Sequence, residues 1–136
     1  ASLQDEMLGI HNLYRCMHSV PPMTWDADIA ANAQAWADGE QWGHSPKPRL
    51  VNGEKIGENL AWRYPSYGNA DAVASWYSEI TNTDDTPANC SDRINPSPKI
   101  CHYTQVVWAA SVKLGCGKGK ATYTISGTAY TDGDFY

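Results

Sequence analysis

The sequence predicts an α+β fold, with helices that flank a modest sheet in a single domain over residues 1–136. Three observations lead to this prediction. Apolar residues recur at helical spacing in three segments of residues 1–82. Residues 113–136 alternate Thr, Tyr and Ile between glycines, as strands do. A length of 136 residues is typical of one domain with a real hydrophobic core.

The first helix is predicted over residues 3–17, "LQDEMLGIHNLYRCM". Ser2 can cap this helix, with Asp5 as a capping-box partner three residues later. Pro21 and Pro22 prevent the helix from continuing. Its apolar stripe consists of Leu3, Met7, Ile10, Tyr14 and Met17.

The second helix is predicted within residues 26–39, "DADIAANAQAWADG", with Asp26 as its cap and Gly39 as its stop. Residues 40–57 are rich in Gly and Pro and are predicted to form a long loop. A loop of that length in a compact domain is often functional. "ENLAW", residues 58–62, is predicted to be a short strand.

The third helix is predicted over residues 69–82, "NADAVASWYSEITN", and an irregular excursion follows over residues 83–101. Residues 102–108, "HYTQVVW", are ambiguous, because their β-branched content favours a strand while their apolar spacing also fits a helix face. Strands are predicted in residues 113–136.

Charge and composition exclude several classes of partner. The net charge is −5, and Lys and Arg form no run, so the footprint of a nucleic-acid-binding protein is absent. Attraction to anionic membranes is equally unsupported, and no apolar run is long enough to cross a bilayer. Six Trp and eight Tyr supply rings that suit half-wet grooves and interfaces.

Four cysteines form an even set without a C-x-x-C pair: Cys16, Cys90, Cys101 and Cys116. This pattern favours two disulfides in a secreted protein over free thiols or a zinc ribbon. The chain begins with Ala and has no signal peptide, as expected of a mature secreted form, and a monomer is the default expectation.

Six segments together resemble one known family: "HNLYR" (11–15), "MTWDADIAANAQAWA" (23–37), "GHSP" (43–46), "GENLAW" (57–62), "SWYSEI" (75–80) and "HYTQVVW" (102–108). In order and spacing the chain is similar to the CAP superfamily (the SCP/TAPS domain), which includes cysteine-rich secretory proteins, insect venom allergens and plant pathogenesis-related class 1 proteins. The resemblance implies a secreted three-layer α-β-α sandwich, with a helix at 102–108.

The chain departs from the family pattern at Trp42, where many relatives have a cysteine, and near its end, where a further Cys and a Pro-Pro-Gly-Asn segment are missing. The usual disulfide set therefore cannot be copied, and four cysteines allow three pairings. We favour Cys90–Cys101, which would close a short loop beside His102, and Cys16–Cys116 by remainder.

The resemblance also implies a cavity lined by two His and two Glu, here His44, Glu58, Glu79 and His102. Carboxylates are costly to bury alone, so a His opposite each Glu would satisfy both. His44 and His102 could then hold a divalent ion such as zinc, with the carboxylates orienting the imidazoles. Alternatively, the four residues only hydrogen-bond across the core. Of the other histidines, His11 is interpreted as structural and His18 as a solvated cap residue.

Five aromatic residues lie within sixteen positions: Trp62, Tyr64, Tyr67, Trp76 and Tyr77. The simple interpretation is core plus a Tyr-rich turn. The alternative is an apolar groove that accepts a flat lipid such as a sterol, a property associated with plant and fungal relatives.

Three functions are therefore expected, in falling order: a secreted binding protein for sterol or other lipid with a defence role; a surface ligand, toxin or allergen acting on a protein receptor; and a metal-dependent hydrolase. The second is weakened because channel-acting relatives usually carry an extra cysteine-rich domain, and this chain stops at Tyr136. The third is weakened because no nucleophile stands in a catalytic motif such as G-x-S-x-G or HExxH.

Overall fold

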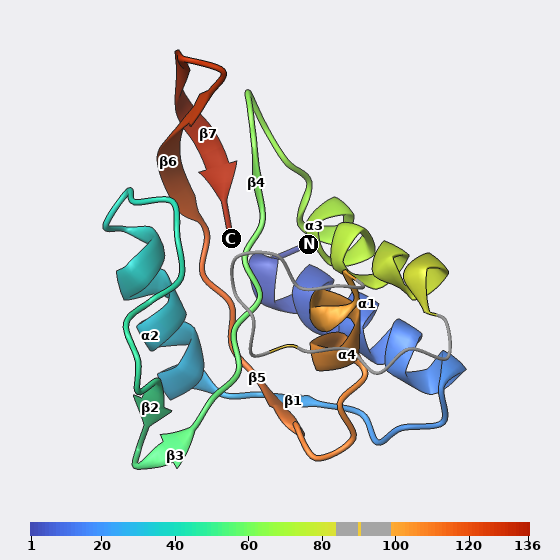
Figure 1. Cartoon of the computed structure of the whole chain (residues 1–136). Coiled ribbons are helices and arrows are strands. Elements are labelled where there is room, and N and C mark those ends of the chain that lie inside the picture. The colour runs from blue at the N-terminus through green and yellow to red at the C-terminus, as the bar shows by residue number, and fades with distance from the viewer. Residues whose placement is uncertain (84–89, 91–98) are drawn as a thin grey trace.

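The computed structural model describes residues 1–83, 90 and 99–136, and it confirms the α+β class. Figure 1 shows three layers, with helices on both sides of the strands. The helices are α1 (Leu3–Met17), α2 (Ala27–Ala37), α3 (Asn69–Tyr77) and α4 (Cys101–Val106), and α2 lies on the other side of the strands from α1, α3 and α4. No helix among the described residues is long and apolar enough to cross a membrane.

The strands of the described residues form three small sheets between the helices. The largest sheet is antiparallel in the order β4-β7-β6, and its β6–β7 hairpin projects at one end of the molecule (Figure 1). A parallel pair, β1 and β5, lies at the other end, and β2 and β3 form a short hairpin. The strands are β1 (Thr24–Trp25), β2 (Leu50–Val51), β3 (Glu54–Lys55), β4 (Trp62–Arg63), β5 (Lys113–Leu114), β6 (Gly119–Ile125) and β7 (Thr128–Phe135).

The predicted helix starts are confirmed. Ser2 and Asp5 form both halves of a capping box on α1, and the Asp26 carboxylate accepts the backbone N–H groups of Asp28 and Ile29 at the start of α2. Each cap satisfies backbone donors that have no partner inside the helix. Helix α2 ends at Ala37 with Asp38 as its C-cap, so the predicted stop, Gly39, directly follows the cap.

The apolar stripe of α1 was predicted wrongly at its last position. Met17 is 63% exposed, and the buried residues of α1 are Met7, His11 and Arg15. These three follow a spacing of four residues, so they share one helix face. His11 and Arg15 therefore lie on the buried face of α1, although the predicted stripe contained neither of them.

The other segments depart from the predictions in several places. The strand predicted over residues 58–62 is wrong except at its last residue, because β4 covers Trp62–Arg63 only. Residues 102–108 begin as the helix that the family resemblance implied, and the third helix continues past Tyr77 as a 3₁₀ turn over Ser78–Asn82. The loop at 40–57 contains the β2–β3 hairpin, which the sequence reading missed. Asn52 and Gly53 form its turn with φ of 51° and 80°, the left-handed conformation that a two-residue hairpin favours.

The two predicted disulfides have different outcomes. The Cys90–Cys101 disulfide is confirmed, but Cys16 and Cys116 are free, so their predicted pairing is wrong. Cys16 is exposed at the end of α1, whereas Cys116 packs against the core. The predicted excursion at 83–101 lies mostly outside the described residues.

Two separate hydrophobic clusters form the core of the described part of the chain. One joins α1, α3 and α4 to the end of the chain: Met7, Ala61, Ala72, Val73, Trp76, Val106 and Tyr136. The other joins α2 to the sheet: Ala37, Ala121 and Phe135. Arg15 fixes α4 on α1, because its buried guanidinium donates to the carbonyls of Val106 (3.0 Å) and Trp108 (2.9 Å), where α4 ends. A cation suits the carbonyl end of a helix.

Candidate functional site

Glu58 is the centre of the first polar group. Its Oε1 lies 2.7 Å from Nδ1 of His44, accepts the backbone N–H of Ser45 at 3.0 Å, and lies 3.3 Å from Nε of Arg49. The Ser45 hydroxyl donates to Oε2. Burial opposes ionisation of Glu58, but the hydrogen bonds from His44 and Ser45 and the charge of Arg49 outweigh it and lower the pKa of this carboxyl.

Glu79 holds the second group from the 3₁₀ turn that follows α3. Its Oε1 lies 2.6 Å from Nδ1 of His102, and its Oε2 accepts the backbone N–H groups of His102 (2.9 Å) and Tyr103 (3.3 Å). The side chain of the N-cap residue, Ile100, makes no capping hydrogen bond to α4. Glu79 therefore supplies the missing acceptor at the start of this helix.

The segment at 57–59 links the two groups. The side-chain amide of Asn59, next to Glu58, donates to the backbone carbonyl of His102 at 3.0 Å. A Cβ at Gly57 would lie 2.0 Å from Oε1 of Gln105, so this segment packs directly against a side chain of α4. The structure thus pairs each predicted His with one predicted Glu and places both pairs along one segment.

The chemistry available to the pairs is limited. Each Nδ1 is held by a carboxylate, and the side chains of His44 and His102 are 43% and 39% exposed, so the outer ring faces reach solvent. The nearest hydroxyl in the first pair, on Ser45, donates its proton to Glu58 and accepts from Arg49 at 3.0 Å. Within the described ranges, no group of three or more His, Cys, Asp or Glu side chains is placed to hold one metal ion.

The sequence reading missed Ser45 and Arg49 as partners of Glu58. Ser45 carried a signal, because it follows His44 directly in "GHSP". Arg49 carried none, since its contact depends on how the loop at 40–57 folds back on itself.

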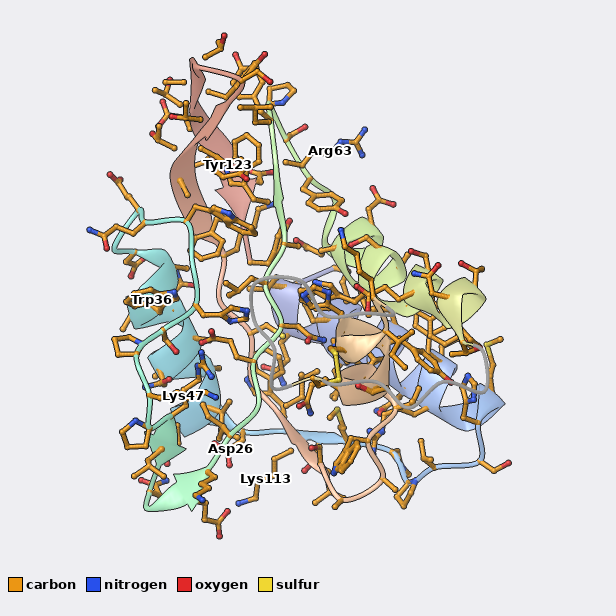
Figure 2. All side chains as sticks on the ribbon, in the orientation of Figure 1. Asp26, Trp36, Lys47, Arg63, Lys113 and Tyr123 are labelled. Carbon is orange, nitrogen blue, oxygen red and sulfur yellow. A yellow bond between two sulfur atoms is a disulfide. The ribbon has the colours of Figure 1, made fainter. Side chains whose placement is uncertain are left out.

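The five aromatic residues predicted to bind lipid lie in three different surroundings. Trp62 and Tyr64 face the β6–β7 hairpin, where they contact Tyr123 and Tyr130; Tyr123 is labelled in Figure 2. Tyr67 and Trp76 belong to the core cluster of α1, α3 and α4. Tyr77 stacks on Tyr14 of α1 at 3.8 Å, and its hydroxyl lies 2.9 Å from Nε2 of His18. His18 is the C-cap of α1, as predicted, but it is half-buried against Tyr77 and Tyr103 rather than solvated.

A cavity of about 490 Å³ lies between the two hydrophobic clusters. One wall is the inner face of α2, and Trp36 of that wall is labelled in Figure 2. The facing wall comes from α1 and α3. Its apolar lining includes Met7, Met23, Ile29, Ala33, Trp36, Leu60, Trp76, Val106 and Phe135. Trp76 is the member of the predicted aromatic set that reaches it.

The cavity opens at the β3 and β5 end. Its lining there includes the exposed residues Glu54, Lys55 and Lys113, and Lys113 pairs with Asp26 at 3.5 Å (Figure 2). Its deeper lining includes Met7 and Phe135, which are fully buried. Cys116 also lines it, and burial raises the pKa of this thiol to about 12, so the thiol is neutral.

Comparison with known proteins identifies the class of the chain. The model of the cysteine-rich secretory protein (CAP) family matches residues 8–131, and the chain belongs to this family. It is 38% identical to pathogenesis-related protein 1 of Arabidopsis thaliana over 84% of this chain and 65% of that protein. It is 36% identical to human cysteine-rich secretory protein 3 over 85% of this chain and 47% of that protein.

The chain thus spans less than two thirds of the length of these relatives. Solved structures show the same fold. Na-ASP-1 superposes with a TM-score of 0.69 at 20% identity, over 99% of this chain and 37% of that chain. The venom allergen-like protein 4 of Schistosoma mansoni superposes with a TM-score of 0.61 at 19% identity, over 99% and 88% of the two chains. The three-layer α-β-α sandwich is therefore confirmed.

Proposed function

We propose that the chain is a secreted binding protein whose ligand is a sterol or another lipid, and that it acts in defence. The observation that carries the ligand class is the apolar cavity between the two core clusters. Protein interiors are normally close-packed, so a cavity between two core clusters is a place where a ligand can be held. A space of about 490 Å³ lies within the range of small-molecule sites.

The names of the relatives support the rest of the proposal. Among the proteins that match are cysteine-rich secretory proteins, pathogenesis-related proteins and a secreted protein of Candida albicans.

A lipid that buries a few hundred Å² of apolar surface gains several kcal/mol at about 25 cal/mol per Å², less the cost of ordering it. The expected affinity is about micromolar.

Zinc is proposed as a weakly bound ligand of His44 and His102. The carboxylates at Nδ1 orient both rings as partners of metal-bound histidines do, and they leave each Nε2 available. The described residues supply no third ligand in this geometry, so water would complete the shell and the affinity would be low. We propose no catalytic role for either pair, and action on a protein receptor through the surface is the alternative function.

The test is a lipid-extract pulldown on the natively purified protein with mass spectrometry of what it retains, followed by saturation binding of radiolabelled cholesterol. Retention of a defined lipid and saturable binding would support the proposal. Failure of every extracted lipid to bind would favour the alternative, action as a surface ligand for a protein receptor.

A further inference from the structure

His11 is a buried polar side chain in the wall of the cavity, and it belongs to neither His–Glu pair. It lies on the inner face of α1, is 4% exposed, and lines the cavity together with Met7 and Trp76. Its ring centroid lies 6.1 Å from that of Trp76. The sequence reading assigned it a structural role only.

The tautomer of His11 follows from its one hydrogen bond. Nδ1 lies 2.7 Å from the backbone carbonyl of Met7, and a carbonyl can only accept, so Nδ1 carries the proton. Nε2 of the neutral ring is then an acceptor with a free lone pair. Among the hydrogen bonds of the described residues, Nε2 has no donor.

Three polar donors around the inner part of the cavity are already engaged. The indole N–H of Trp76 donates to the backbone carbonyl of Leu60 at 2.8 Å. The hydroxyl of Tyr136 donates to the backbone carbonyl of Tyr67 at 2.6 Å. The side-chain amide of Asn59 donates to the backbone carbonyl of His102. Nε2 of His11 is an unengaged acceptor on the α1 wall of the cavity, where Met7 and Trp76 also line the space, so a buried ligand can reach it.

The charge of the ring supports the same conclusion. Burial lowers the pKa of His11 to about 4, and the nearby charge of Arg15 adds to this effect against the hydrogen bond to Met7. The ring is neutral near pH 7, so it offers no positive charge to a carboxylate.

We propose that His11 makes the cavity selective for a neutral, largely apolar ligand that carries one hydroxyl group, which donates its hydrogen bond to Nε2 of His11. This inference rests on the proposed lipid-binding function and names the class of lipid. A fatty acid would differ, because its carboxylate would stay at the mouth, near Lys55 and Lys113, with its chain inside. Lys113 is already paired with Asp26, and Glu54 precedes Lys55, so the mouth gives little net attraction to an anion.

The experiment compares matched ligands on the intact chain: cholesterol against cholest-4-en-3-one, which lacks the donor, and hexadecanol against palmitate. The native protein should prefer each alcohol by about three- to tenfold, the usual value of one hydrogen bond. The variant His11→Phe keeps an apolar ring but loses the acceptor, so the ratio should fall to about one while the ketone still binds. Circular dichroism and the melting temperature establish that the variant is folded.

A second measurement needs no variant. The ¹⁵N resonance of His11 Nε2 in the native protein should shift when the alcohol is added and stay in place with the ketone. Equal affinity for alcohol and ketone, or an unmoved Nε2 resonance at saturation, would overturn the inference while leaving lipid binding intact. Preference for palmitate would also overturn it. No binding of any of the four ligands would overturn the proposed function together with it.

Discussion

The carboxylate of Glu79 binds His102 at two points: Oε1 lies 2.6 Å from the imidazole Nδ1, and Oε2 accepts the backbone N–H at 2.9 Å. One side chain thus fixes both the rotamer of a predicted site residue and the start of the helix that carries it. The pair therefore has a structural role whether or not a metal binds. Glu58 and His44 lack this second link, since Glu58 accepts the backbone of Ser45 instead.

Replacement of Glu79 should therefore destabilise the protein as well as alter the site. The Glu79→Ala variant leaves the N–H groups of His102 and Tyr103 without their acceptor, and we expect a loss of about 2 kcal/mol in the free energy of unfolding. Urea denaturation measures this value. The matched control is Glu54→Ala, which removes an exposed carboxylate and should change stability by less than about 0.5 kcal/mol. Equal effects of the two changes would contradict the capping role.

The stability of the protein should fall in mild acid because of His11. Its pKa is about 4 in the fold, against an ordinary value of 6.5, so between these values the unfolded chain binds a proton that the folded chain does not. Stability then decreases as pH falls from 6.5 to 4, by on the order of 3 kcal/mol. The measurement is the free energy of unfolding as a function of pH.

The control for this pH dependence is His11→Phe. Its unfolding curve should be flatter than that of the native protein between pH 6.5 and 4. The lowered pKa of Glu58 also removes stability in acid, but that contribution is common to both proteins. Parallel curves for the two proteins would show that His11 titrates as freely as an exposed histidine.

The sequence predicted the elements of this fold far better than its interior. Ser2, Asp5 and Asp26 marked two helix starts because caps depend on local hydrogen bonds. His11 and Arg15 were missed as members of the core face because polar residues are normally exposed. The pairing of Glu79 with His102 joins residues 23 positions apart, and the resemblance to a known family, rather than any local pattern, brought them into one prediction.

No sequence pattern predicted the cavity, because the cavity exists only where the two hydrophobic clusters do not pack against each other. Cys116 shows the same limit: an even number of cysteines suggested a partner, but the position of the thiol is set by tertiary packing. A Cβ at Gly117 would lie 2.5 Å from Cα of Gln34, so the segment that carries Cys116 packs directly on α2. That contact draws Cys116 into the interior, away from the exposed Cys16.

The free cysteines should react at very different rates. Iodoacetamide should modify Cys16 in the native protein, because it is exposed, and leave Cys116 unmodified until the protein unfolds, because its thiol is buried with a pKa of about 12. Peptide mass spectrometry after timed alkylation measures this. The Cys90–Cys101 peptide pair should appear only in unreduced digests. Resistance of both Cys16 and Cys116 to alkylation in denaturant would instead indicate that they are linked.

Zinc should bind weakly, with one-to-one stoichiometry near neutral pH, and more weakly below about pH 6, where protonation competes for the imidazoles. Calorimetry on the double variant His44→Ala with His102→Ala should show no heat of binding. His18→Ala is the control, since His18 is engaged with Tyr77 at the C-terminal cap of α1 and should not matter. Equal heats from native and doubly substituted protein would leave the pairs with a structural role alone.

Sterol binding should depend on the cavity rather than on the exposed aromatic residues. Ala33 lines the cavity from α2, so Ala33→Phe places a ring in the space and should weaken binding of radiolabelled cholesterol by at least about tenfold. Tyr64 is 49% exposed beside Tyr130, so Tyr64→Ala should leave the affinity within about twofold. His44→Ala should also leave it unchanged, because the zinc and lipid sites use different side chains. The melting temperature of each variant must first show that it is folded. If Tyr64→Ala abolishes binding while Ala33→Phe does not, the lipid lies against the aromatic segment that the sequence first indicated, and the cavity has another occupant.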